Sequence, residues 1–95
     1  MTKGDLAAAV ALRREITQAD AAVLVDVIFD PETGIIAQAL LRGEEVKLHG
    51  FGVFGTMQRS ARDGHNPKTG KKIKIEASRV VKFRAGSNLR KHVNG

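Results

Sequence analysis

Apolar residues recur at helical spacing at the start of the chain. Leu6, Val10 and Ile16, with alanines between them, form one apolar stripe on a helix. Thr2 and Asp5 stand three residues apart immediately before this stripe. Such a pair forms a capping box, in which each side chain satisfies a free amide of the first turn. The pattern therefore predicts a helix that begins just after Thr2.

The same signals repeat further along the chain. Thr17 and Asp20 have the capping spacing again, so a second helix should begin at about Gln18. Its apolar positions recur at helical intervals; they are Val23, Leu24, Val27 and Ile28.

Residues 30–34, Asp-Pro-Glu-Thr-Gly, interrupt this helical pattern. Proline lacks a backbone donor and clashes with the preceding turn, which disfavours a continuous helix through Pro31. An Asp cap followed by Pro in the first helical position is also a good helix start. We therefore expect two helical pieces, about residues 18–29 and 31–42, separated by a kink or short turn. Gly43 should end the second piece in a left-handed conformation.

From Val46 onward, apolar residues stand among turn formers, which is typical of strands. Residues 63–70 are rich in Gly, Asn, Asp and Pro and should form a loop between strands at about 52–61 and 71–76. These strands carry basic residues near the loop, so they fit a two-stranded ribbon in solvent better than a buried sheet. With a short helix at about 86–93, the expected fold class is α+β.

A chain of 95 residues fits one small domain, with a helical part at residues 1–45 and a sheet part at 46–95. It contains four Phe but no Trp or Tyr, so its own core is small and we expect a dimer. The absence of cysteine excludes disulfides, thiolate catalysis and sulfur-ligated zinc. No apolar run is long enough to span a membrane and no secretion signal is recognisable, which favours a soluble intracellular protein.

Charge is distributed unevenly along the chain. Residues 1–50 contain five Lys or Arg and eight Asp or Glu, a net −3, whereas residues 51–95 contain eleven and two, a net +9. A solubilising surface needs no such segregation. The separation of charge therefore favours a polyanionic partner for the second half.

Two glycine patterns resemble nucleotide-binding motifs. Residues 50–55 match G-x-G-x-x-G, but strand-like residues follow where a dinucleotide site needs a helix and an acidic residue. Residues 64–72 have the wrong glycine spacing for a phosphate loop and end in Lys72 where a hydroxyl is required. His49, His65 and His92 are dispersed, without metal-ligand spacing. We therefore expect no enzyme activity, metal, cofactor or small-molecule substrate.

The remaining signal is the basic ribbon around Asn66-Pro67. At strand spacing, Arg62, Lys72 and Lys74 are expected to line one face of it. Asn-Pro alone is more often an ordinary turn, but here it lies between basic strands. A rigid, partly apolar proline at the tip of such a ribbon suits insertion between stacked bases from the minor groove.

The chain resembles the bacterial HU and integration host factor family of DNA-bending proteins over essentially its whole length. The resemblance is carried by three stretches, in order and at the right separations: Gly50-Phe51-Gly52-Val53-Phe54, Gly64-His65-Asn66-Pro67-Lys68-Thr69-Gly70-Lys71-Lys72-Ile73-Lys74-Ile75 and Val81-Lys82-Phe83-Arg84-Ala85-Gly86-x-x-Leu89-Arg90.

The resemblance implies an intertwined dimer with a helical base, a small antiparallel sheet and two projecting β-arms, at about residues 59–74, that embrace DNA. It implies that Pro67 intercalates and kinks the duplex. Arm residues implied to contact DNA are Arg59, Arg62, His65, Asn66, Pro67, Lys68, Thr69, Lys71, Lys72 and Lys74. Body residues implied to hold flanking DNA are Lys3, Lys47, Lys82, Arg84 and Arg90.

The sequence departs from the family pattern at two places. His65 stands where Arg usually precedes Asn-Pro, so we expect DNA binding to tighten as pH falls through the range in which histidine gains a proton. About four extra residues near 30–33 interrupt what is normally a continuous helix of the dimer interface.

The leading functional hypothesis is an architectural dimer, associated with the nucleoid in the cytoplasm, that bends or compacts DNA with weak sequence preference. We expect it to favour bent, nicked or flexible duplexes and to form a homodimer. A subunit of a site-specific, integration-host-factor-like heterodimer is the alternative. A basic RNA-binding module is more remote, because stacking aromatic residues are absent. A purely structural assembly protein leaves the basic half unexplained.

Overall fold

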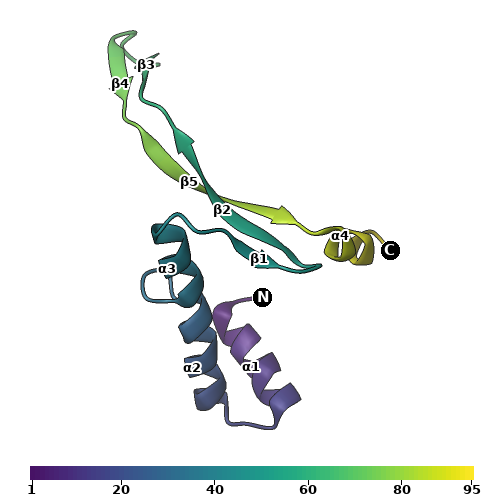
Figure 1. The fold of residues 1–95 in the computed structure, drawn as a ribbon. Helices are drawn as coiled ribbons and strands as arrows, with labels where there is room; N and C mark the ends of the chain where they lie inside the picture. Colours follow the sequence, from purple (N-terminus) through teal and green to yellow (C-terminus); the bar gives the residue numbers. More distant parts are fainter. The chain divides into compact units, whose positions relative to one another are not determined.

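The computed structural model describes residues 1–95, which form two compact units, Met1–Glu44 and Glu45–Gly95. The first unit consists of helices, and the second consists of antiparallel strands followed by one helix (Figure 1). This mixture confirms the predicted α+β class.

The two predicted helix starts are confirmed. In α1 (Lys3–Arg14) the Thr2 amide donates to Asp5 Oδ2 at 2.9 Å and the Asp5 amide donates to Thr2 Oγ1 at 3.1 Å, which completes the capping box. In α2 (Gln18–Phe29) the Thr17 hydroxyl accepts from the Asp20 amide at 3.1 Å. Both helices therefore begin where short-range hydrogen bonds place them.

The core of the first unit is small. Ala7, Ala21 and Val25 are buried where α1 packs on α2. Around them lie the partly buried side chains of Leu6, Val10, Ala11 and Ile16. Eight large apolar side chains of this unit are 40–82% exposed; they are Leu12, Val23, Leu24, Val27, Ile28, Phe29, Ile35 and Leu41. So large an apolar surface on so small a unit is typical of a subunit interface.

Between α2 and α3 (Ile35–Leu41) the structure differs from the prediction. A helix was expected from residue 31, but residues 31–33 form a turn and α3 begins only after Gly34. Asp30 caps this turn: its Oδ1 accepts the backbone amides two and three residues further on, at 2.9 and 2.8 Å. Gly34 is extended, with φ −64° and ψ 156°, so the single turn that Asp30 starts does not continue as a helix.

Acid is expected to loosen this turn. Backbone hydrogen bonds from Thr33 and Glu32 hold the pKa of Asp30 below its ordinary value of 3.8. Because the pKa is lower in the folded state, the stabilisation is complete above about pH 4 and is lost as pH falls through the lower, folded value. In NMR titrations the Thr33 amide shift should move with a midpoint below 3.8, and Asp30→Asn should abolish that transition. A midpoint at or above 3.8 would contradict the assignment.

The end of α3 is as predicted. Gly43 has φ +79°, its amide donates to the Leu40 carbonyl at 3.0 Å, and the Glu44 amide donates to the Ala39 carbonyl at 3.0 Å. This pair of bonds is the Schellman motif, which satisfies the last free carbonyls of a helix.

The second unit contains a three-stranded antiparallel sheet in the order β1 (Val46–Leu48), β2 (Gly52–Arg59), β5 (Ser78–Ala85). Phe54 lies opposite Phe83, and their ring centroids are 4.7 Å apart. The rings give one face of the sheet its apolar character.

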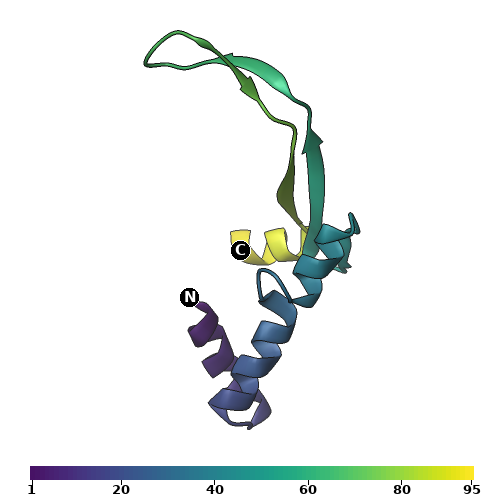
Figure 2. The same ribbon diagram turned by 90° about the vertical axis from the view of Figure 1, so that its left-hand side faces the viewer.

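Beyond this sheet the chain continues as a ribbon of β3 (Arg62–His65) and β4 (Lys72–Ile75). Figure 2 shows the ribbon as a curved arm that extends away from β2 and β5. The arm was predicted, but its loop is shorter than expected. Residues 62–65 pair as a strand, so only residues 66–71 remain for the tip.

The last helix, α4 (Ser87–Asn94), is joined to the turn before β2 by backbone bonds. The Leu89 amide donates to the Gly50 carbonyl at 3.1 Å, and the Gly86 amide donates to the Phe51 carbonyl at 2.8 Å. These bonds fix where α4 leaves the sheet. None of the four helices combines the length and apolar character needed to cross a membrane.

Candidate nucleic-acid interface

The tip of the arm is a closed turn built by Asn66. Its amide donates to the Lys71 carbonyl at 2.8 Å, and its carbonyl accepts from the Gly70 amide at 2.7 Å. Its side-chain oxygen also accepts the Lys68 amide at 2.9 Å. None of these bonds uses Pro67, whose side chain is exposed. The tip therefore presents a free proline ring on a turn that closes without it.

The arm has one charged and one mainly apolar face. Directly paired residues of antiparallel strands share a face. Lys72 lies opposite His65, and Lys74 lies opposite Asp63, so these four side chains share the charged face. The prediction that Arg62 lies with Lys72 and Lys74 is wrong, because Arg62 pairs with Ile75. The register between the two strands, which decides the residues that pair, is set by the arm tip and is not evident from the spacing within each strand.

The opposite face of the arm carries Arg62, Gly64, Ile73 and Ile75. A side chain added at Gly64 would lie 2.9 Å from Ile75 Cδ1 and 3.7 Å from Ile73 Cγ1. The two isoleucines thus cover the backbone at Gly64, which confirms the assignment of faces. Arg62 remains beside them as the cation of this face.

The predicted body cations of the sheet lie on one face. Val53 of β2 pairs with Lys47 of β1 on one side and with Arg84 of β5 on the other. Lys82 pairs two residues further along β2, so it lies on the same face. Arg59 lies six residues beyond Val53, an even separation that places it there as well. We call these four residues, Lys47, Arg59, Lys82 and Arg84, the cationic sheet face.

Two carboxylates lie beside cations of the candidate site, one on the sheet and one on the arm. Neither was predicted from the sequence as a site residue. Glu45 lies 3.7 Å from the ammonium of Lys47, and Asp63 lies opposite Lys74 on the arm. Asp63 is one of only two acidic residues after residue 50, a signal that could have identified it. Each reduces the positive potential that a polyanion meets at its site.

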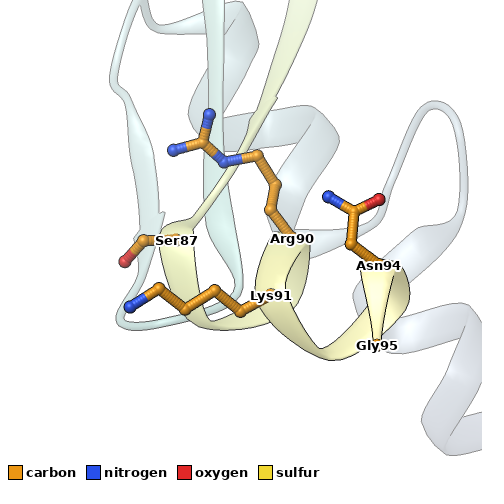
Figure 3. A pocket seen from close by; sticks show the side chains of 5 residues that line it. All are labelled: Ser87, Arg90, Lys91, Asn94 and Gly95. Atoms are coloured by element: carbon orange, nitrogen blue, oxygen red, sulfur yellow. The ribbon is translucent and has the colours of Figure 1, made fainter.

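Arg90 belongs to a third group on α4. Figure 3 shows Ser87, Arg90, Lys91 and Asn94 around a shallow pocket that runs along this helix. Lys91 was not among the predicted contacts, although its position next to Arg90 could have identified it. Two adjacent cations beside hydroxyl and amide groups suit a phosphate oxygen.

Lys3 is the one predicted body residue in the helical unit, and it is already paired. Its ammonium lies 2.8 Å from Asp26 Oδ1, an ion pair between α1 and α2 whose side chains are about half exposed. The hydrogen bond to Asp26, and then the attraction between the charges, hold the pKa of Lys3 above its ordinary value. A phosphate must therefore compete with Asp26 for this cation.

Asp26→Asn is expected to strengthen DNA binding about two- to fivefold at low salt, because it releases Lys3 from an exposed ion pair that contributes up to about 1 kcal/mol. A titration of labelled duplex at fixed salt measures the change. Asp20→Asn is the matched control, since it removes the same charge from the same helix but no ion pair of Lys3. An equal gain from both variants would show that net charge, not Lys3, is responsible.

Comparisons with known proteins agree with this arrangement. A family profile described as "Bacterial DNA-binding protein" matches residues 1–94. The DNA-binding protein HU of Streptococcus mutans is 46% identical over 88 residues, which cover 93% of this chain and 92% of that protein. Integration host factor subunit alpha of Acinetobacter baumannii is 43% identical over 93 residues, covering 98% and 91%.

Solved structures show the same fold. An Anabaena HU–DNA cocrystal structure superimposes with a TM-score of 0.82 at 41% identity, over 98% of this chain and 97% of that one. A mutant of HU from Thermotoga maritima superimposes with a TM-score of 0.66 at 25% identity, over 98% and 99%. The resemblance predicted from the sequence is confirmed: the chain belongs to the bacterial DNA-binding protein family of HU and integration host factor, whose members are DNA-binding architectural proteins that act as dimers.

Proposed function

We propose that this protein bends or compacts double-stranded DNA as a homodimer, with weak sequence preference and a preference for bent, nicked or flexible sites. Each arm enters the minor groove and Pro67 inserts between base pairs. The observation that carries this proposal is the arm itself, a cationic ribbon whose closed tip presents an exposed proline. In other minor-groove binders, HU and integration host factor relatives among them, such wedges kink DNA by about 20–90°.

The proposed contacts fall into two groups. The arm uses Arg62, His65, Asn66, Pro67, Lys68, Thr69, Lys71, Lys72 and Lys74, whereas Arg59, at the end of β2, contacts DNA from the cationic sheet face. The body uses Lys3, Lys47, Lys82, Arg84 and Arg90, to which we add Lys91. Most of these are cations that neutralise phosphates, and such contacts give affinity without distinguishing sequences. Weak sequence preference follows from this composition.

The arrangement supports a mechanical role. Deformation of a duplex costs free energy, which additional backbone contacts must offset. The cationic sheet face and the α4 cations supply such contacts for flanking DNA, while the wedge localises the bend at the arm tip. The proposed action is non-catalytic. We propose that it takes place on the nucleoid, in the bacterial cytoplasm. The helical unit contributes to the dimer interface through its exposed apolar side chains.

A mobility-shift titration at several salt concentrations tests the proposal. It compares linear, nicked and pre-bent duplexes with double-stranded RNA. Affinity should fall steeply with salt and be highest for nicked or pre-bent DNA. Preference for RNA, or binding that ignores salt, would overturn it. The mass of the purified chain in solution distinguishes a homodimer from a subunit that requires a different partner.

His65 gives the proposal a pH dependence. It shares the charged arm face with Asp63, Lys72 and Lys74. A protonated imidazole adds a cation to that face, so affinity at fixed salt should be higher at about pH 5.5 than at about pH 8. His65→Gln is the control that should remove the difference.

A further inference from the structure

The turn at residues 30–34 is a rigid element held by its own hydrogen bonds. Besides the two bonds that the Asp30 side chain accepts, the Gly34 amide donates to the Asp30 carbonyl at 3.1 Å. The Gln38 side chain donates back to the Glu32 carbonyl. The segment therefore has a definite shape, which its own hydrogen bonds hold.

Close packing at Gly34 fixes the path of the chain through this turn. A β-carbon at Gly34 would lie 2.6 Å from the Asp30 carbonyl oxygen, 2.7 Å from the Asp30 nitrogen and 2.8 Å from the Ile28 carbonyl oxygen. All three are backbone atoms, so the fit requires glycine. Between α2 and α3 the direction of the chain is thus decided by tight contact of main chain with main chain.

Apolar side chains are exposed on both sides of the turn. Val27, Ile28 and Phe29 at the end of α2 are 49%, 40% and 46% exposed, and Ile35 at the start of α3 is 61% exposed. Ile28 and Ile35 are seven residues apart, so in an uninterrupted helix they would share a face about 10 Å apart. Asp30 and Gly34 both have extended ψ values, 132° and 156°, so the helix does not run through the turn. The spacing of Ile28 and Ile35 therefore differs from that in an uninterrupted helix.

We propose that the turn at residues 30–34 selects the partner subunit: this chain pairs with a second copy of itself and rejects a chain whose α2 continues without the turn. The inference rests on the proposed homodimer and adds what makes it selective. In a two-fold dimer the same surface meets itself, so each copy presents apolar residues at the spacing that the other requires. A partner without the turn can pack against the α2 side chains or against Ile35, but not against both. A dimer with such a partner therefore leaves apolar surface exposed to water.

Subunit mixing tests this selection. The intact chain is unfolded and refolded together with an affinity-tagged copy, and native mass spectrometry counts the dimers. Two intact chains should give about half mixed dimers, the random expectation for a self-complementary interface. Two variants serve as turn-free partners: one lacks residues 30–33, and one carries alanine at all five positions 30–34, which favours a continuous helix of the original length.

With either turn-free partner, mixed dimers should fall at least tenfold below the random proportion, while each variant forms dimers with itself. Glu32→Gln is the matched control, because it changes an exposed charge at the turn and not a backbone bond; it should mix randomly. Random mixing with a folded turn-free partner overturns the proposal. A monomeric intact chain would instead refute the homodimer on which the proposal rests.

A measurement on the intact dimer keeps the proposal testable if neither variant folds. Dimers made from isotope-labelled and unlabelled chains report contacts between subunits by filtered NMR. The methyl groups of Ile28 and Ile35 should show contacts to the partner subunit. Their absence in an intact dimer would overturn the proposal, because the residues beside the turn would then lie outside the interface.

Discussion

Pro67→Ala is expected to remove most of the bend that the protein imposes on a straight duplex. The hydrogen bonds that close the arm tip run through Asn66 and do not involve the proline ring. The tip therefore stays closed, and the variant loses only the wedge. Energy transfer between dyes at the two duplex ends measures the bend. Affinity should fall more for an intact duplex than for a nicked one, because the nick lowers the cost of deformation.

Gln18→Ala is the control, since Gln18 is an exposed residue of the helical unit that lies outside the proposed contacts and outside the turn at residues 30–34. It should leave the bend unchanged. An unaltered bend in Pro67→Ala, with binding retained, would show that the wedge is not the proline. Bending would then have to come from the cations that hold flanking DNA.

Replacing Lys72 and Lys74 together with glutamine should reduce DNA affinity on the order of 10- to 100-fold at 0.1 M salt. Both side chains lie on the charged face of the arm, and we expect each to neutralise one phosphate. Two lost phosphate contacts should flatten the slope of log K against log salt by about 1.8, since each contact releases about 0.9 counterion. Titrations at four or more salt concentrations give both quantities.

Arg13→Gln with Arg14→Gln is the control of equal charge. It lowers the net charge by the same two units, but at the end of α1 and outside the proposed contacts. It should change affinity modestly and leave the slope nearly unchanged. If the two double variants behave alike, the arm lysines act only through net charge.

Most secondary structure was predictable because its signals are local. Thr2 with Asp5, Thr17 with Asp20, and Gly43 each act on backbone groups within a few residues, and the structure contains the bonds they predict. The start of α3 was not predictable in this way. An aspartate before a proline begins a helix or a turn equally well, and the contacts of Gly34 with the main chain of residues 28 and 30 decided for the turn.

Residue types and short spacings were enough to predict most of the helical and strand segments, the basic ribbon ending at Asn66-Pro67, the segregation of charge and the family. The tertiary structure alone decided three things: that Arg62 lies on the arm face opposite Lys72 and Lys74, that Lys3 is held by Asp26, and that Lys47, Lys82 and Arg84 share a face. The physical reason is the same in each case. Strand pairing and contacts between helices bring together residues that are far apart in the chain, and no local pattern encodes which residues meet.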